Sequence, residues 1–340
     1  MKPDSLLPPF SHLYVEEELL EGPWVEEVRR IRDRLTKAVV VPIGSFQEIT
    51  QRRTARWNDQ KRSPKLVLAR KHGELVYPCS DVAPNFGHAN FYYAVPMQNC
   101  LYDCEYCYLQ GMYTSANLVY FVNQKEMMDR VLELSEELGE IYLCIAYDND
   151  LLAMEGMLGV TAEWVEGLRG ADRVTVEVRT KSANFRAIKK LKPADNFILA
   201  WTLSPAPVIE RFEAGTPGLE ARIGAMTEAM RAGWRVRLCL DPLLPVQGWT
   251  ETYDELFERL DQESSFWTKL EDSSYGLFRM PKQILRQARK ARPDSALLHS
   301  AHSREERGLM TLSGTAQSSL LSHVGKKLRE RLDSGQVWET

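Results

Sequence analysis

The sequence predicts an α/β fold: a partial (β/α)6 TIM-like barrel with an N-terminal extension and a C-terminal helical or irregular region. The first observation behind this prediction is that short β-rich runs alternate with helical segments through six units, which implies a parallel sheet with right-handed crossovers. The second is that no GxGxxG turn follows any of these runs, so a doubly wound dinucleotide-binding sheet has no support.

The expected strands share the β-branched and aromatic composition of buried sheet segments. In chain order they cover 90–97, 140–147, 173–179, 196–203, 235–240 and 275–280. Helices are expected at 124–138, 161–169, 183–191 and 251–262. A further long helix is expected to end at Arg231, with Thr216 and Pro217 as its N-terminal cap. Ahead of the barrel, 24–37 has the spacing of an amphipathic helix, whereas 51–64 is basic and polar, which is typical of a surface loop.

The chain divides on this prediction into a mixed N-terminal region (1–88), the barrel (89–280) and a C-terminal substrate or lid region (281–340). Its 340 residues are 44% hydrophobic, enough for one large core with a smaller appendage. A net charge of −4 argues against a surface wholly built for nucleic acid, but it is compatible with a local basic groove. No run approaches the ~18 apolar residues of a membrane span, and no signal-peptide layout opens the chain, so we expect a cytoplasmic protein with no membrane partner.

Three of the six cysteines form the pattern CxxxCxxC, at Cys100, Cys104 and Cys107. In a reducing compartment such a group indicates metal binding rather than disulfides. Thiolates are the natural ligands of iron–sulfur clusters, and a cubane normally takes four of them. A [4Fe-4S] cluster with three protein ligands keeps one open iron, which can chelate the amino and carboxylate groups of S-adenosylmethionine. The motif therefore predicts both cofactors, and with them reductive cleavage of S-adenosylmethionine to a 5′-deoxyadenosyl radical.

The alternative from a different class is a non-enzymatic zinc or nucleic-acid binding protein. A structural zinc site needs a fourth Cys or His at close spacing. The flanking sequence offers only His88 for that place. Tyr106, directly before the last cysteine, is also typical of the radical enzymes, so the motif favours the iron–sulfur cluster.

The loop around these cysteines also resembles that of a known family. Residues 100–110 (CLYDCEYCYLQ) are similar to the cluster loop of spore photoproduct lyase, a radical S-adenosylmethionine DNA-repair enzyme. The resemblance extends over about 85–265 and includes 176–181 (VEVRTK), 208–222 and 232–260. It implies a barrel of the radical S-adenosylmethionine type that repairs 5-thyminyl-5,6-dihydrothymine, a cross-linked thymine dimer in DNA, back to two thymines.

The resemblance also implies roles for single residues and partners. Lys181 would pair with the carboxylate of S-adenosylmethionine, and Thr202 stands where the family has a serine near the same cofactor. Tyr106 and Tyr108 occupy the places of the tyrosines implicated in returning a hydrogen atom. The implied partners are DNA that carries a thymine lesion and an electron donor such as flavodoxin or ferredoxin.

The first departure from the family concerns its hydrogen-donating cysteine, which ends the second strand in a Cys-Thr-Ser-Asp context. Aligning that context on Asp150 puts Tyr147 in the place of the cysteine, as a hydrogen-atom relay or as a wall of the pocket. Cys144 lies three residues earlier, and an odd offset in a strand points it to the opposite face, so we expect it to pack outward against a helix. Asp148 and Asp150 lie beyond the strand, on the face that carries barrel active sites, and are candidates for binding ribose or substrate.

The second departure is the C-terminal region, where the family has an aromatic and basic stretch that grips the lesion. Residues 298–314 show no counterpart, although His302, Arg304 and Arg307 are candidates for a similar role. The segment 282–292 (KQILRQARKAR) carries five basic residues at helical spacing and is either a phosphate-gripping helix or a solvated helix face. These departures keep a second hypothesis open, in which the same radical chemistry acts on a modified nucleoside or a peptide.

Overall fold

The computed structural model describes residues 10–340 apart from 52–55, 81–82 and 305–307. Its largest sheet has the strand order β18-β14-β13-β11-β10-β9-β5-β4. These strands are β4 (Val76–Pro78), β5 (Phe91–Ala94), β9 (Ile141–Cys144), β10 (Val174–Thr180), β11 (Phe197–Thr202), β13 (Arg235–Leu243), β14 (Asp272–Leu277) and β18 (Val337–Glu339). Neighbouring strands from β5 to β18 are parallel, and β4 is antiparallel to β5. The predicted partial barrel is confirmed, because its six expected strands occur in the expected order.

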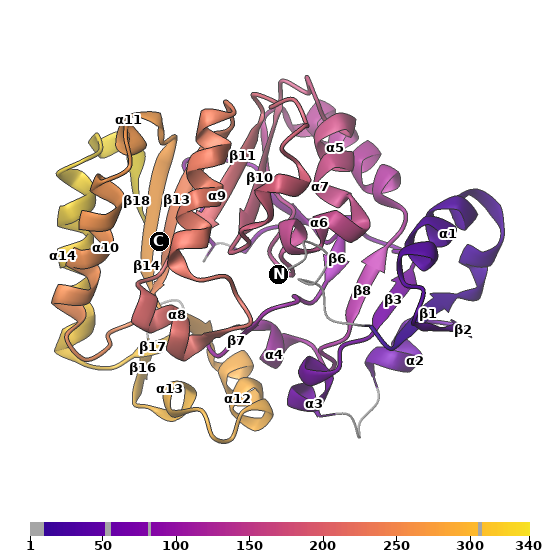
Figure 1. Ribbon diagram of the computed structural model, residues 1–340, viewed down its shortest axis with the longest axis horizontal. Helices are drawn as coiled ribbons and strands as arrows, with labels where there is room; N and C mark the ends of the chain where they lie inside the picture. The colour runs from indigo at the N-terminus through magenta and orange to yellow at the C-terminus, as the bar shows by residue number, and fades with distance from the viewer. Residues whose placement is uncertain (1–9, 52–55, 81–82, 305–307) are drawn as a thin grey trace.

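Side chains alternate between the two faces of this sheet. Leu143, Val176 and Leu199 belong to the main hydrophobic core together with residues of the covering helices. Tyr142 and Glu177 point into the concave interior, where the tyrosine hydroxyl donates to the carboxylate (2.5 Å). Figure 1 shows the covering helices over the outer face of the sheet. They are α5 (Gln124–Leu138), α6 (Leu151–Leu158), α7 (Val160–Gly167), α9 (Leu219–Arg231), α10 (Trp249–Asp261) and α14 (Thr315–Arg329).

The N-terminal region contributes to a second sheet, with the order β2-β1-β3-β8-β6, at the right of Figure 1. Its strands are β1 (His12–Glu16), β2 (Val39–Ile43), β3 (Leu66–Ala69), β6 (Met97–Gln98) and β8 (Leu118–Phe121). Helix α1 (Val25–Arg34) buries Val28 and Ile31, so the amphipathic helix expected in this region is confirmed. Because β6 and β8 follow residue 88 and complete this sheet, residue 88 does not separate the two sheets, and the division of the chain into three regions stays a prediction.

Two segments differ from their predicted local structure. The helix predicted for 183–191 is wrong beyond one 3-10 turn at Asn184–Ala187. The basic stretch 51–64, predicted as a loop, contains the short helix α3 (Trp57–Arg62), which buries Trp57. Residues 52–55 of that stretch lie outside the described part of the chain. Each of the two segments buries one aromatic side chain, Phe185 in the first and Trp57 in the second.

The predicted Thr-Pro cap of the long helix is also wrong. Helix α9 begins at Leu219, and its N-cap is Gly218. Instead of capping the helix, the Thr216 hydroxyl donates to the Glu213 carbonyl (2.7 Å) and accepts a hydrogen bond from Arg222 (2.6 Å). The Thr216 side chain that local rules assign to the cap is therefore taken by contacts with Glu213 and Arg222.

The C-terminal region is helical and also contains a small antiparallel sheet, with the order β15-β17-β16. Its strands are β15 (Arg279–Pro281), β16 (His302–Arg304) and β17 (Leu309–Leu312). The remaining elements are the short pair β7 (Asp103–Cys104) and β12 (Glu213–Ala214), and the helices α2 (Gln47–Thr50), α4 (Leu109–Met112), α8 (Ala206–Phe212), α11 (Phe266–Lys269), α12 (Lys282–Ala291) and α13 (Ala296–His299). Within the described residues, none of the helices has the length and apolar character needed to cross a bilayer.

Helices α4 and α12 touch through Gly111, and this contact allows a direct test of the packing. A Cβ atom at Gly111 would lie 2.2 Å from the Ile284 carbonyl oxygen, so Gly111→Ala forces one backbone away from the other. We expect the free energy of unfolding to fall by about 1–3 kcal/mol in a urea titration. The control is Gly224→Ala in α9, where no atom lies within 4 Å of the added methyl group and where alanine should stabilise the helix by about 0.5–1 kcal/mol. Equal stability of the two variants would contradict the tight α4–α12 contact.

Candidate active site

The three cysteines of the motif lie on one loop that starts in an unusual backbone conformation. Asn99, the residue before Cys100, has a φ of 69°, in the left-handed region that asparagine tolerates better than most side chains. Its side chain is completely buried, and its amide donates to the carbonyls of Ser115 (2.9 Å) and Asn117 (2.8 Å). This residue fixes the direction in which the chain enters the cysteine loop.

The loop is then fastened by partners from distant parts of the chain. The Lys61 ammonium group on α3 donates to the carbonyls of Cys100 and Tyr102, both at 2.6 Å. On the other side, β7 pairs with β12, which places Cys104 opposite Glu213. Burial raises the pKa of all three thiols, that of Cys100 to about 12. Without a bound metal these side chains are therefore neutral thiols, held on a rigid loop.

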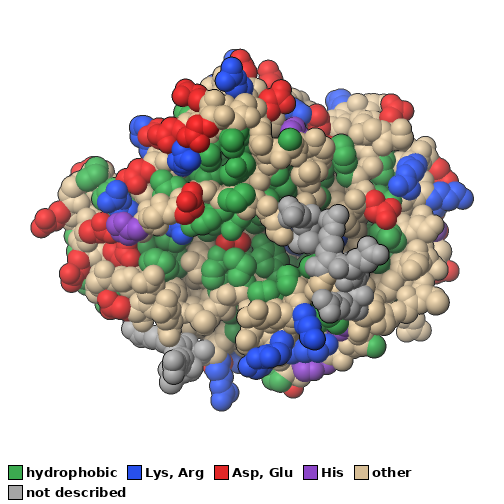
Figure 2. Space-filling model, turned by 180° about the vertical axis from the view of Figure 1, so that it is seen from behind, with side chains coloured by type: hydrophobic (Ala, Val, Ile, Leu, Met, Phe, Trp, Pro, Cys, Tyr) green, Lys and Arg blue, Asp and Glu red, His purple; other side chains and the backbone are tan. Residues whose placement is uncertain are grey.

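The loop borders a cavity of about 450 Å³ at the carboxyl ends of the barrel strands, where active sites of barrel folds lie. Figure 2 shows a hollow lined by apolar side chains in the middle of one face of the molecule. All but one of the residues predicted for the site line the cavity, and the exception is Asp148. Those that line it are Cys100, Cys104, Tyr106, Cys107, Tyr108, Tyr147, Asp150, Lys181 and Thr202.

A buried charge network supports the cavity behind Lys181. The Lys181 ammonium group lies 5.5 Å from the centre of the Tyr106 ring. The Tyr106 hydroxyl and the Arg222 guanidinium both donate to the Glu213 carboxylate, which also accepts from Ser204 (2.9 Å). Burial alone would raise the pKa of Glu213, but Lys181 and Arg222 outweigh it and hold that pKa below its usual range. Glu213 is therefore an ionised anchor, and Tyr106 directs its hydroxyl to this anchor.

The two aspartates beyond β9 have most of their hydrogen-bonding capacity occupied by protein. Asp150 is the N-cap of α6 and accepts from the backbone of Ala153 (3.1 Å) and Lys181 (2.7 Å) and from the Thr180 hydroxyl (2.7 Å). Asp148 accepts hydrogen bonds from the Tyr113 and Tyr108 hydroxyls. These contacts favour positioning roles, in which Asp150 holds the backbone of Lys181 in place. The predicted contacts of both aspartates with ribose or substrate stay predictions.

Tyr147 lines the cavity and packs against the interior cluster that also contains Cys79. Its ring packs against Phe91 and Tyr93, at centroid distances of 6.0 and 6.1 Å. Its backbone carbonyl accepts from the Tyr108 hydroxyl (2.5 Å), which ties the cysteine loop to the end of β9. Tyr147 therefore offers an O–H bond beside the cavity, within an aromatic frame.

The prediction that Cys144 packs outward is wrong. Cys144 belongs to the interior cluster with Phe91, Tyr142 and Tyr147. The prediction counted an odd offset between 144 and 147, but β9 ends at Cys144, and the period-two rule does not apply to the irregular segment that follows. The thiol is fully buried and is not among the residues that line the cavity.

The sequence analysis missed three charged residues that line the cavity: Arg179, Asp241 and Arg279. Arg279 pairs with Asp241 at 3.4 Å. Arg179 donates to Glu177 (3.1 Å), while its Nη2 atom is buried without a hydrogen-bond partner among the described residues. The sequence contains a pattern that could have predicted Arg179. Glu177, Arg179 and Lys181 alternate with apolar or small residues, so they share the interior face of β10 and of the residue that follows it.

The model of the family described as "Spore photoproduct lyase" matches residues 85–306 of this chain. The chain belongs to the spore photoproduct lyase family. Curated relatives include the spore photoproduct lyase of Bacillus subtilis (strain 168), 25% identical over 173 residues, and that of Geobacillus sp. (strain Y412MC61), 23% identical over 181 residues. Each match covers 50% of this chain and 51% of the relative, so the chain spans about half the length of the curated relatives it matches.

Solved structures of spore photoproduct lyase share the fold over almost the whole chain. The enzyme complexed with dinucleoside spore photoproduct has a TM-score of 0.76 at 18% identity, over 98% of this chain and 99% of that one. A double mutant with bound AdoMet and dinucleoside spore photoproduct also has a TM-score of 0.76, at 17% identity and the same coverage. At this level of identity the comparison establishes the fold of this member of the spore photoproduct lyase family.

The donor set of the cavity fits the iron–sulfur cluster that the lyase family implies. Among the described residues that line the cavity, three are cysteines. None of the others is a histidine or a fourth cysteine. Three thiolates leave one iron of a cubane open, whereas a structural zinc ion requires four protein ligands. In the described ranges, no three His, Cys, Asp or Glu side chains are grouped to hold a single metal ion. Cys100, Cys104 and Cys107 would hold the cluster, with Lys181 and Thr202 facing the same space.

Of the residues predicted to replace the lyase family's C-terminal lesion-gripping stretch, His302 is described with its side chain, and it does not line the cavity. The Arg289 guanidinium donates to His302 Nδ1 (3.2 Å), and the same ring nitrogen lies 2.6 Å from the Ser300 carbonyl oxygen, which holds the ring against α12. The backbone of Arg304 ends β16, and Arg307 lies outside the described residues. Instead, β15 and β17 bring Arg279, Pro281 and Leu309 to the cavity.

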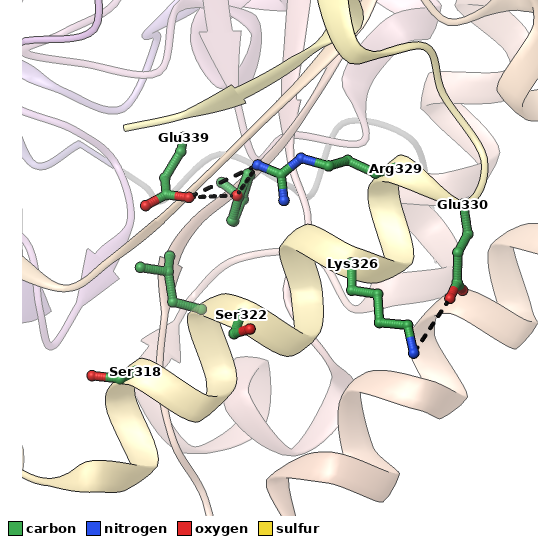
Figure 3. Close-up of a pocket in the computed structure, with 8 residues that line it drawn as sticks. Ser318, Ser322, Lys326, Arg329, Glu330 and Glu339 are labelled. Carbon is green, nitrogen blue, oxygen red and sulfur yellow. Dashed lines mark hydrogen bonds and ion pairs between the residues drawn. The ribbon is translucent and has the colours of Figure 1, made fainter.

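A second hollow, of about 600 Å³, lies between α14 and the end of β18 (Figure 3). It contains no thiol among its described lining residues, and its charged groups satisfy one another. The Tyr275 hydroxyl donates to Glu339 (2.6 Å) and accepts from Arg329 (2.9 Å), and Lys326 pairs with Glu330 at 3.9 Å. This surface lacks the chemistry that the cysteine loop gives to the cavity in the barrel.

Proposed function

We propose that the protein is a radical S-adenosylmethionine enzyme that repairs a thymine-type lesion in DNA. One observation carries the proposal: the three thiols of the cysteine loop, Lys181 and Thr202 line a single cavity at the carboxyl ends of the barrel strands. The family match supports the reaction type. Solved structures of similar fold with bound AdoMet and dinucleoside spore photoproduct support the choice of cofactor and substrate.

Different residues of the chain have different roles in this proposal. Cys100, Cys104 and Cys107 would hold the cluster, which would supply the electron that cleaves S-adenosylmethionine and so provide a carbon radical able to take a hydrogen atom from the substrate. Lys181 offers its ammonium group to the carboxylate of the nucleotide, and Asp150 holds the Lys181 backbone through the hydrogen bond described above. Apolar walls exclude water from the reactive centre, which protects a radical from side reactions.

The substrate end of the cavity is formed by groups that suit a pyrimidine lesion. Tyr147 supplies an aromatic face, and Arg179 and Arg279 supply hydrogen-bond donors for carbonyl or phosphate oxygens. A lesion in DNA must leave the base stack to reach such a cavity, which costs less at a damaged step. The electron comes from a partner of the flavodoxin or ferredoxin class.

The proposal is tested with the protein reconstituted anaerobically with iron and sulfide. Dithionite, S-adenosylmethionine and the dinucleoside spore photoproduct are added, and 5′-deoxyadenosine and thymine products are measured by chromatography. We expect both products. If 5′-deoxyadenosine forms without thymine repair, the lyase assignment is lost. The second candidate, a radical enzyme with another substrate, then remains, and the presence of Tyr147 in place of the family cysteine favours it.

The role of Tyr147 is tested by Tyr147→Phe, which keeps the ring and removes the O–H bond. If the phenol returns a hydrogen atom to the substrate radical, the variant should cleave S-adenosylmethionine at an unchanged rate and yield much less repaired thymine. Tyr93→Phe is the matched control, because Tyr93 packs on the same ring and is not a cavity-lining residue. Unchanged repair in Tyr147→Phe would leave Tyr147 only the role of a wall.

A further inference from the structure

Helix α12 is fastened to the outside of the cysteine loop. Its backbone touches α4 at Gly111, as described above, and Arg292, directly after the helix, pairs with Asp103 and donates to Gln110 (2.5 Å). The next segment adds a hydrogen bond from Ser295 to Glu105 (2.5 Å). Pro281, the residue that precedes α12, lines the cavity. The helix is therefore a rigid element that starts at the edge of the cavity.

The outer face of α12 carries an unpaired basic stripe, which we define as Lys282, Arg286 and Lys290. The three side chains are exposed, whereas Leu285 and Ala288 on the other face are buried. A spacing of four residues places them on one side of the helix, about 6 Å apart along its axis. No acidic group lies within ion-pair distance of the stripe in the part of the chain that the structure describes.

Exposed basic side chains on two longer helices, α1 and α14, are paired with acidic ones. On α1, Arg29 pairs with Glu26 and Arg30 with Glu27. Figure 3 shows the same on α14, where Lys326 is joined to Glu330. Like charges four residues apart repel and destabilise a helix slightly. A stripe that keeps this repulsion in a chain of net charge −4 is suited to a polyanion.

We propose that the basic stripe of α12 binds the phosphodiester backbone of the DNA strand whose lesion enters the cavity. The inference rests on the proposed function and extends it to a surface outside the cavity. Helix α12 forms part of the lower edge of the molecule in Figure 1, and Figure 2 shows Lys and Arg side chains gathered along the lower edge beneath the hollow. Three fixed cations beside the opening match a row of phosphates in charge, and such contacts supply most of the sequence-independent affinity for DNA.

The test compares two triple variants that remove the same charge. Lys282→Gln, Arg286→Gln and Lys290→Gln remove the stripe. Lys189→Gln, Lys190→Gln and Lys192→Gln are the control, because these exposed residues precede β11 and lie at the opposite, amino-terminal ends of the strands. Binding of a fluorescein-labelled DNA duplex is measured by anisotropy at several salt concentrations, with the cluster-loaded full chain.

For the stripe variant we expect the slope of log Kd against log salt to fall by about 2.7, which corresponds to three neutralised phosphates at about 0.9 each. Repair of the free dinucleoside lesion and cleavage of S-adenosylmethionine should be retained. A slope equal to that of the wild type and the control overturns the inference. If the wild type binds the duplex through the stripe but repairs no dinucleoside lesion, the proposed substrate fails while the DNA-binding surface stands.

Discussion

Cys104→Ala is expected to abolish cleavage of S-adenosylmethionine and to reduce the bound iron to background. Removal of one of three thiolates leaves a cubane with two protein ligands, and the described cavity lining offers no further cysteine and no histidine to replace the lost one. Loss of a ligand should exceed the about 10–100-fold penalty that follows loss of an outer-shell partner. The measurements are iron and sulfide content after anaerobic reconstitution, the visible absorbance of the cluster, and the yield of 5′-deoxyadenosine.

The control for this prediction is Cys239→Ala. Cys239 is also a buried thiol, in β13, but it does not line the cavity. The control should retain iron and activity, with only the small loss of stability expected for a smaller core side chain. Retention of the cluster in Cys104→Ala, or zinc in place of iron in the wild type, would contradict the cluster assignment and with it the proposed chemistry.

Arg237→Met is expected to lower the free energy of unfolding by about 3–5 kcal/mol, because it leaves buried carboxylates without a counter-charge. The Arg237 side chain is almost fully buried in the barrel and pairs with Glu177 (2.6 Å) and with Asp272. It also lies 3.5 Å from the centre of the Phe86 ring, so the contact is both ionic and aromatic. Urea titration monitored by circular dichroism measures the effect.

Arg235→Met is the matched control on the same strand. Arg235 pairs with Glu271 at 2.6 Å, but both side chains are about one-third exposed. Water and side-chain entropy limit such a surface pair to about 0–1 kcal/mol. A similar loss of stability in both variants would show that the barrel interior does not depend on the buried pair.

The effect of Arg237→Met should also depend on pH. Burial raises the pKa of Glu177, but Arg179 and Arg237 outweigh it and leave that pKa below its usual value. A depressed folded-state pKa contributes stability above the unfolded pKa, and this contribution is lost as the pH falls through the folded value. Without Arg237 the Glu177 pKa rises, so the difference between variant and wild type should be largest near pH 7 and should shrink as the medium is acidified.

Much of the site could be predicted from local patterns. The spacing of Cys100, Cys104 and Cys107 predicts three ligands on one short loop. The strand preceding this loop and the segment that ends in Thr180-Lys181 are both parallel strands, whose carboxyl ends meet at one edge of a sheet. Their side chains therefore converge on one cavity wherever the helices pack.

The errors arose where side-chain direction depends on contacts that residue spacing does not reveal. Cys144 faces the barrel interior together with Tyr142, and β9 ends at Cys144, so the offset to Tyr147 runs through an irregular segment and does not assign a face. The Thr216 hydroxyl left its expected cap position for the Glu213 carbonyl and the Arg222 guanidinium. These contacts outweigh a local capping preference of about 1 kcal/mol.

The sequence by itself predicted the fold class, the order of the barrel strands and the family, because these depend on the residue spacing of the cysteine loop and on the alternation of strands and helices; the three cluster ligands stay a prediction from the same spacing. Only the tertiary structure decided that Arg179 and Arg279 reach the cavity, that Tyr106 turns its hydroxyl to Glu213, and that the stripe of α12 has no acidic partner among the described residues. The physical reason is that a charge network depends on which charged groups contact one another in the low-dielectric interior and which remain unpaired at the surface. These contacts depend on the three-dimensional fold and cannot be derived from a local sequence pattern.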